Sequence, residues 1–134
     1  MRIHATRSSV CLGDDFAGPE EKDQVLDEQA RLSDLMKQLA GYVPYFGNVV
    51  WSIRCDDKVI GYLYSPGEKA AYRYKLTAGN KRVSELGEET VFCRYYSGKD
   101  IRIRNIKVFS LPGTIYLKKV MLYEEQMRKE GMLF

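Results

Sequence analysis

The sequence predicts a protein of the α+β class, with elements in the order β-β-α-β-β followed by a β-rich segment and a C-terminal helix. Apolar residues between 32 and 43 recur at spacings of three, four and seven, which is the period of an amphipathic helix. Residues 49–64 alternate with a period of two around Asp56-Asp57, which is typical of a β-hairpin. A length of 134 residues favours one domain, 1–134, with a candidate sub-boundary at 65–69.

The N-terminal region begins with an alternating stretch and continues into a charged one. Residues 2–7 predict a first strand with Ile3 and Ala5 facing inward. Gly13-Asp14-Asp15 and Gly18-Pro19 then predict that residues 8–19 form a loop, or the end of a strand followed by a turn. Residues 20–30 carry few apolar side chains, so they form either a short edge strand near Lys22–Leu26 or an exposed approach to the helix.

The helix has start, face and stop signals of its own. Ser33 is the expected N-cap, Gly41 is expected to end the helix in the left-handed conformation, and Pro44 prevents its continuation. The residues expected to face the core are Leu32, Leu35, Met36, Leu39, Tyr42 and Val43.

The hairpin has a predicted register. A two-residue turn at Asp56-Asp57 would bring all the large apolar side chains to one face of the sheet. The expected pairs are Cys55 with Lys58, Ile53 with Ile60, Trp51 with Tyr62, and Val49 with Tyr64.

The second half begins after the break at Ser65-Pro66-Gly67 and is richer in strands. Residues 70–76 predict a strand, 81–89 a short helix or a loop, and 91–96 with 101–109 a second hairpin. Residues 114–130 predict a final helix with a stripe of Tyr116, Val120, Tyr123 and Met127, ending before Gly131. Residues 115–122 also alternate acceptably as a strand, so both alternatives remain open.

The order of elements in the first half resembles the ubiquitin-like β-grasp arrangement, in which a helix packs across a mixed sheet. The run Leu32-Ser33-Asp34-Leu35 looks like the helix start of many ubiquitin-like domains. This resemblance covers about half of the chain. The stretch Ser9–Asp15 (SVCLGDD) is similar to a motif in small uncharacterised bacterial proteins, which offer no function to transfer.

The spacing of the cysteines and the hydropathy of the chain predict the cellular compartment of the protein. Cys11, Cys55 and Cys93 are far apart and form no pair with metal-ligand spacing, which predicts reduced thiols and no zinc site. The first ten residues lack the apolar core of a signal peptide, and no apolar run approaches the roughly 20 residues of a membrane span. We therefore expect a soluble, cytoplasmic protein with no cofactor, no metal and no membrane partner.

The net charge of +3 is distributed unevenly. Residues 1–66 carry seven Lys/Arg and ten Asp/Glu, whereas residues 67–134 carry fourteen and eight. A basic half is typical of proteins with an acidic partner, but it also fits two halves that face each other or an ordinary solvated surface.

Three sets of residues are candidates for chemistry. The basic and aromatic residues of the second half would suit single-stranded nucleic acid, because cations attract phosphates and aromatic rings stack on bases. The candidate nucleic-acid-binding residues are Arg73, Lys75, Arg94, Arg102, Arg104 and Lys107. The acidic loop Asp14, Asp15, Glu20 and Glu21 is a candidate partner-binding loop, with a solvated turn or a weak divalent-cation site as alternatives. His4 and Cys11 are the one His–Cys combination, and an extended chain would point them to opposite faces.

No catalytic pair, metal spacing or phosphate-binding loop stands out in a sequence that is otherwise ordered and rich in tyrosine. The sequence therefore favours a non-enzymatic protein-interaction module of bacterial or phage type, such as an inhibitor, immunity or adaptor protein. The alternative is RNA or single-stranded DNA binding through the basic second half, and a third hypothesis is an enzyme that acts through Cys11 or the acidic loop.

Overall fold

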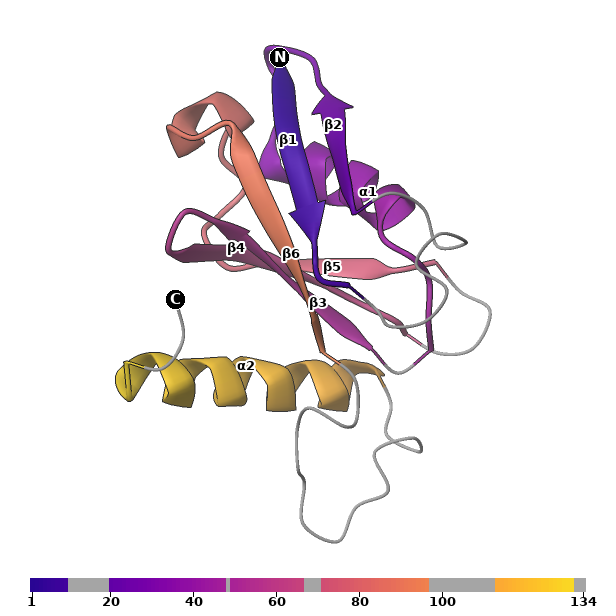
Figure 1. Ribbon diagram of the computed structural model, residues 1–134, viewed down its shortest axis with the longest axis vertical. Helices are drawn as coiled ribbons and strands as arrows, with labels where there is room; N and C mark the ends of the chain where they lie inside the picture. Colours follow the sequence, from indigo (N-terminus) through magenta and orange to yellow (C-terminus); the bar gives the residue numbers. More distant parts are fainter. Residues whose placement is uncertain (10–19, 48, 67–70, 97–112, 132–134) are drawn as a thin grey trace, which may run out of the picture.

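The protein has an α+β fold, as predicted: its described residues form a mixed six-stranded sheet and two α-helices (Figure 1). The computed structural model describes residues 1–9, 20–47, 49–66, 71–96 and 113–131, and the side chains from 116 onward in the last range. The elements are β1 (Arg2–Arg7), β2 (Glu21–Val25), α1 (Leu32–Tyr42), β3 (Val50–Cys55), β4 (Lys58–Tyr64), β5 (Arg73–Leu76), a 3₁₀ turn η1 (Val83–Leu86), β6 (Thr90–Tyr96) and α2 (Gly113–Lys129).

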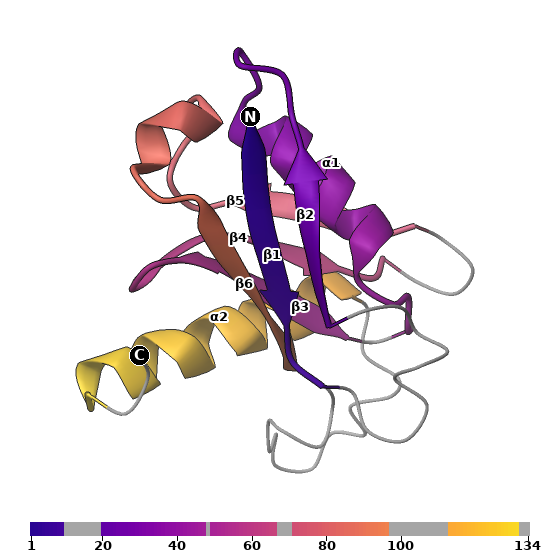
Figure 2. The same ribbon diagram turned by 45° about the horizontal axis from the view of Figure 1, so that its top comes forward.

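The sheet has the strand order β2-β1-β6-β3-β4-β5. β1 and β6 run parallel at its centre, and every other neighbouring pair is antiparallel. β6 comes from the second half of the sequence, yet it lies between β1 and β3 from the first half (Figures 1 and 2). Residues 67–69 of the expected sub-boundary lie outside the described residues.

One face of the sheet packs against α1. The predicted apolar face of this helix is confirmed, since Leu32, Leu35, Met36 and Leu39 are fully buried, and Tyr42 and Val43 nearly so. Ile3 and Ala5 point into the same core from β1, as predicted. The helix is therefore held to the sheet by apolar contact along its whole length.

The ends of α1 differ from the prediction. The helix begins at Leu32 with Arg31 as its N-cap, so Ser33 lies inside the first turn. Asn80 Oδ1 accepts a hydrogen bond from the Ser33 N–H at 2.9 Å, which gives this free N–H a partner from a distant loop. Gly41 belongs to the helix and has no positive φ, and the extended Val43 forms the C-cap before Pro44.

The β3–β4 hairpin confirms the predicted turn but not the predicted register. Cys55 pairs with Lys58 as expected, but Ile60 is an extra residue on β4, so Ile53 pairs with Gly61 instead of Ile60. Beyond this bulge, Trp51 pairs with Leu63, Ser52 with Tyr62, and Val50 with Tyr64. The expectation that all large apolar side chains share one face is therefore wrong, because Tyr62 lies on the face opposite Trp51.

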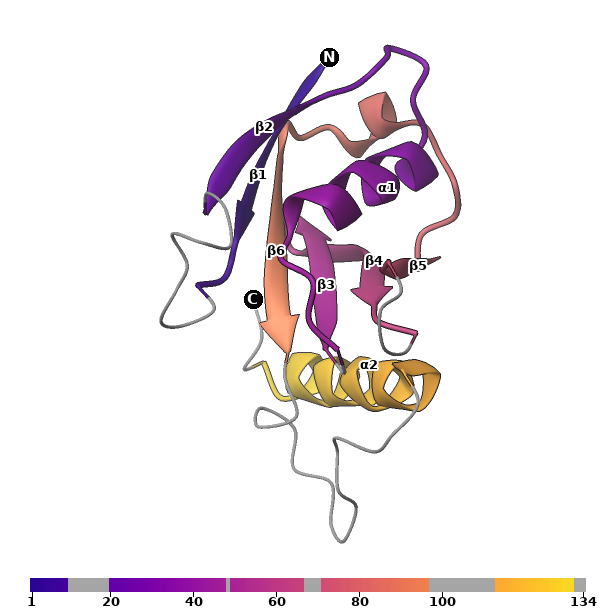
Figure 3. The same ribbon diagram turned by 90° about the vertical axis from the view of Figure 1, so that its right-hand side faces the viewer.

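The second face of the sheet is covered in part by α2. Residues 113–129 form a helix, which decides against the strand alternative, and Gly131 follows with a φ of 68°. Tyr116, Leu117 and Val120 of α2 pack on Val50, Tyr62 and Tyr96 of the sheet. Figure 3 shows α2 at the C-terminal end of β6, away from α1. The sheet is therefore buried on both faces where β3 and β4 cross this helix.

The remaining predictions that concern described residues agree with the structure in the type of element. The stretch 20–30 contains the edge strand β2, the stretch 81–89 contains the 3₁₀ turn η1, and residues 90–96 form β6. The expected strand at 70–76 is shorter and begins at Arg73. Residues 101–109, which were expected to form a hairpin with β6, lie outside the described residues.

Gly61 is required by a close approach of two elements. A Cβ atom there would lie 2.8 Å from Cε of Met36 and 2.9 Å from the carbonyl oxygen of Lys75. We expect Gly61→Ala to lower the free energy of unfolding by about 1–3 kcal/mol, because the β5 backbone must move to admit the methyl group. Urea denaturation measures this loss, and Gly47→Ala, where nothing lies within 4 Å of the added Cβ, is the matched control. Equal midpoints for the two variants would contradict the prediction.

Candidate functional site

A fully buried carboxylate, that of Glu124, lies between α2 and the sheet. Three hydroxyl groups donate to it: Tyr62 to Oε1 at 2.6 Å, Ser52 to Oε1 at 3.0 Å, and Tyr96 to Oε2 at 2.7 Å. Nη2 of Arg54 lies 3.5 Å from Oε2 and completes an ion pair. All four partners come from strands, so the carboxylate attaches the helix to the sheet.

The strand register explains how these partners come together. Ser52 and Arg54 are two residues apart on β3 and therefore share a face. The bulge at Ile60 places Tyr62 directly opposite Ser52, and β6 pairs its Arg94 with the same residue. With the predicted register, Tyr62 would have pointed to the α1 core.

The chemistry of this cluster is that of a closed structural site. Burial raises the pKa of both Tyr62 and Tyr96, and the neighbouring Glu124 raises both further. The two phenols therefore remain protonated at neutral pH and act as donors. Since Glu124 has no exposed surface, its carboxylate is in contact with the protein alone.

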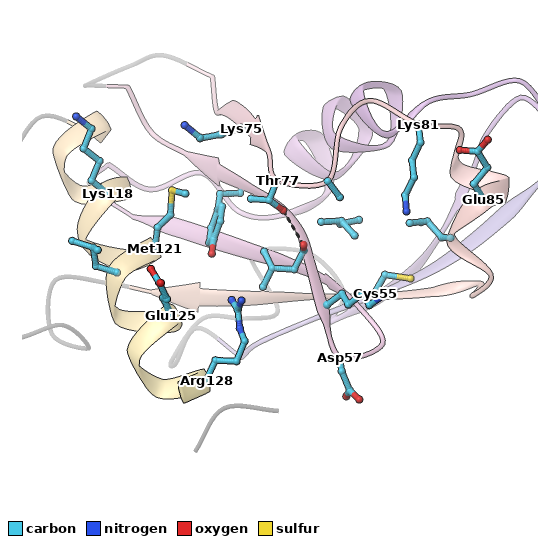
Figure 4. A pocket seen from close by; sticks show the side chains of 17 residues that line it. Cys55, Asp57, Lys75, Thr77, Lys81, Glu85, Lys118, Met121, Glu125 and Arg128 are labelled. Atoms are coloured by element: carbon cyan, nitrogen blue, oxygen red, sulfur yellow. Dashed lines mark hydrogen bonds between the residues drawn. The ribbon is translucent and has the colours of Figure 1, made fainter. Parts of the chain in front are cut away.

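A groove opens beside this buried cluster, and we call it the α2 groove. It has a volume of about 900 Å³ and lies between β4, the end of β5, η1 and α2 (Figure 4). Val59, Ile60, Met121 and Leu122 give it apolar walls, and the Leu122 side chain is 59% exposed. Three acidic residues and five basic ones also line it, the basic ones being Lys58, Lys75, Lys81, Lys118 and Arg128.

The described candidate residues for nucleic-acid binding lie in two places. Arg73 and Lys75 are exposed on the edge strand β5, whereas Arg94 lies on β6 with its guanidinium 5.2 Å from the ring centre of Tyr96. β3 and β4 separate these two strands. Arg102, Arg104 and Lys107 lie outside the described residues.

The tyrosines that could have stacked on bases are mostly occupied within the fold. Tyr72 and Tyr96 are buried, and Tyr95 packs on the ring of Trp51 with the ring centres 5.1 Å apart. Tyr74, which is 36% exposed, remains available at the edge of the sheet. Arg73, Tyr74 and Lys75 are thus neighbours on β5, with Tyr74 on the opposite face from the two cations, and Arg94 lies apart from all three.

The acidic candidate loop is described only at its end. Glu20 and Glu21 are exposed, and Asp14 and Asp15 lie outside the described residues. Oε2 of Glu21 lies 3.4 Å from Nε2 of His4. Within the described part of the chain, no group of three or more His, Cys, Asp or Glu side chains is arranged to hold a metal ion.

His4 joins β1 to β2 through two carboxylates. Its Nδ1 lies 2.8 Å from Oδ1 of Asp23, and this hydrogen bond, with Glu21 as a second partner, raises the pKa of His4 above 6.5. The protonated ring is the form that both carboxylates favour, so its contribution to stability is complete below pH 6.5 and is lost as the pH rises through the raised pKa.

We expect Asp23→Asn to return the pKa of His4 toward 6.5, because it removes the strongest cause of the increase. His4 is the single histidine of the chain, so one-dimensional proton NMR can follow its titration without assignment. Asp27→Asn is the control, since Asp27 hydrogen-bonds its own loop at the Gln29 N–H. An unchanged titration in Asp23→Asn would contradict the assigned pairing.

Two of the three cysteines lie among the described residues, and both are buried. Cys55 and Cys93 are free and buried, and burial raises the pKa of both thiols, that of Cys93 to about 12. Neither is therefore a ready nucleophile at neutral pH. Cys11, paired with His4 as a candidate in the sequence, lies outside the described residues.

Sequence reasoning missed Glu124 and its partners on β3. The available signal was position, because Glu124 follows Tyr116 and Val120 at intervals of four and therefore lies on the apolar face of α2. A carboxylate on such a face requires donors from the surface that it packs against. Ser52 and Arg54 on β3 are two of these donors.

Among the described residues, no helix combines the length and the apolar character needed to cross a membrane. Comparison of the chain with protein-family models gives no match. Searches of curated proteins and of solved structures likewise find no significant similarity.

Proposed function

We propose that this chain is a small non-enzymatic protein-interaction module, of the inhibitor, immunity or adaptor type found in bacteria and phages, and that it binds its partner at the α2 groove. The observation that supports this most is the exposure of Leu122 beside Met121 in a groove framed by basic side chains. An exposed apolar surface with a polar rim is typical of a protein-binding site.

Two further features support the proposal. Glu124, whose carboxylate accepts from three hydroxyl groups, is fully buried and attaches α2 to the sheet, so it is out of reach of a substrate. We also propose a cytoplasmic location and a ubiquitin-like β-grasp origin, supported by the buried free thiols and by a helix that packs across a mixed sheet. A ubiquitin-like fold supports a protein-interaction function by analogy.

Site-specific photo-crosslinking tests the proposed surface. A benzophenone amino acid at position 122 should give a discrete crosslinked product in host cells, whereas the same group at Lys22, exposed on the far edge strand β2, should not. The product should resist nuclease and be digested by protease. Identical product patterns at the two positions, or none at either, would count against a protein partner at this groove.

A second candidate function is binding of RNA or single-stranded DNA by the basic second half. It is favoured by the segment from Ala71 to Arg82, which carries Arg73, Lys75, Lys81 and Arg82 and no acidic residue. An electrophoretic mobility shift with a 20-nucleotide thymidine or uridine oligomer tests it. The complex should weaken steeply with salt and with Lys75→Glu, and the absence of any complex at low salt would remove this candidate.

A further inference from the structure

Among the described residues, β5 is the last strand of the sheet, and one side of its backbone has no partner strand. On its other side it pairs with β4, and the N–H of Thr77 donates to the carbonyl of Ile60 at 3.2 Å in the same register. In an antiparallel ladder, alternate residues direct their N–H and C=O groups toward the partner strand. The backbone groups of Tyr74 and Leu76 therefore point outward, where they offer a template for another strand.

The two sides of β5 differ in chemistry. Lys75 lines the α2 groove, which lies on the second face of the sheet, and Figure 4 shows it on the same side of the groove as Lys118. On the α1 side, a hollow of about 610 Å³ is lined by Ala40, Tyr72 and Tyr74 among others. A strand added to β5 would thus meet positive charge on one face and mainly apolar surface on the other.

The charges also favour one kind of partner. Arg73 and Lys75 are exposed, and no acidic residue occurs between Ala71 and Arg82. Two copies of β5 placed edge to edge would bring like charges together, which disfavours a symmetric dimer. An acidic strand would instead pair with these cations directly across the ladder.

We propose that β5 receives an extended segment of the partner in which acidic and apolar residues alternate, and that this segment extends the sheet by one strand. Its backbone hydrogen-bonds to Tyr74 and Leu76, its carboxylates face Arg73 and Lys75, and its apolar side chains face the hollow beside α1. This inference rests on the proposed function, since it specifies the chemistry of the protein partner.

Defined peptides test the charge requirement. The probe is a fluorescein-labelled octapeptide of alternating glutamate and valine, and its counterpart has lysine in place of glutamate. Fluorescence anisotropy at pH 7 should show at least about tenfold tighter binding of the acidic peptide. Lys75→Glu should abolish this preference, whereas Lys22→Glu on the opposite edge should leave it unchanged.

A matched pair of variants tests the backbone. Tyr74→Pro removes the outward N–H and leaves the bonds between β5 and β4 in place, while Tyr74→Ala removes the ring and keeps the N–H. Both should retain the circular dichroism of the parent. The acidic peptide should bind Tyr74→Ala measurably and Tyr74→Pro at least about tenfold more weakly than that.

Equal binding to the proline and alanine variants would overturn strand addition, and so would equal binding of the acidic and basic peptides. A thymidine oligomer that binds while the acidic peptide does not would also overturn it. If the peptide fails but position 122 still crosslinks a protein, the interaction module stands and the strand-addition proposal alone is wrong. If the peptide does not bind and position 122 gives no crosslinked protein, the strand-addition proposal and the proposed function are both wrong.

Discussion

Glu124→Ala is expected to lower the free energy of unfolding by about 3–5 kcal/mol. The substitution removes a fully buried carboxylate that accepts hydrogen bonds from Tyr62, Tyr96 and Ser52. These buried donors would lose their acceptor, and Arg54 would lose its counter-charge. Urea denaturation followed by circular dichroism measures the global loss, and amide hydrogen exchange along α2 shows whether this helix detaches first.

The neighbouring residue provides the control. Glu125 is exposed and makes a surface ion pair with Lys129 at 3.4 Å, so Glu125→Ala should change the free energy of unfolding by at most about 0.5 kcal/mol. Glu124→Gln keeps the shape of the side chain and should fall between the two. If Glu124→Ala were no more destabilising than Glu125→Ala, the buried cluster would not be what holds α2 to the sheet.

The elements that could be predicted are those whose sequences satisfy a single periodicity. β1 alternates between core and surface, and α1 presents one apolar stripe, so both were placed within a residue or two. Their patterns are informative because each has one buried and one exposed side. The two-residue turn at Asp56-Asp57 was likewise readable, and Asp56 adopts the positive φ of 56° that such a turn needs.

The register of the hairpin could not be read because β3 has no exposed side. All six of its residues are buried, with Trp51 in the α1 core and Val50 under α2. Register is weakly specified by pattern when both faces are buried, since a slip by one residue no longer places apolar side chains in water. The bulge at Ile60 was therefore invisible, and the placement of Tyr62 beside Glu124 followed from it.

The predicted ends of α1 were wrong for a related reason. A cap predicted from local sequence assumes that the nearest hydroxyl satisfies the free N–H groups, which favoured Ser33. In the fold the helix begins earlier, at Leu32, and the N–H of Ser33 itself donates to Asn80, which is 47 residues away in the sequence. Long-range donors and acceptors of this kind, like those around Glu124, become visible only once the strands are in place.

Trp51→Ala is the second large expected effect, with a loss of about 3–5 kcal/mol in the free energy of unfolding. The indole is fully buried in the α1 core, and its ring centre lies 5.1 Å from that of Tyr95. Truncation to alanine leaves a large cavity in the middle of the sheet. Because Trp51 is the single tryptophan, circular dichroism must replace fluorescence as the probe of unfolding.

A double-mutant cycle separates packing from hydrogen bonding at this position. The Tyr72 hydroxyl accepts from Trp51 Nε1 at 3.0 Å and from the Phe46 N–H at 3.0 Å, and it donates to the Pro44 carbonyl at 2.6 Å. Tyr72→Phe alone should cost about 1–3 kcal/mol, because the buried indole N–H loses its acceptor. In a Trp51→Phe background this part of the cost disappears, so the same substitution should cost less. If Tyr72→Phe lowers the free energy of unfolding equally in the parent and in Trp51→Phe, the indole contributes through its volume alone. The Tyr72 hydroxyl would then act only on the loop at Pro44 and Phe46.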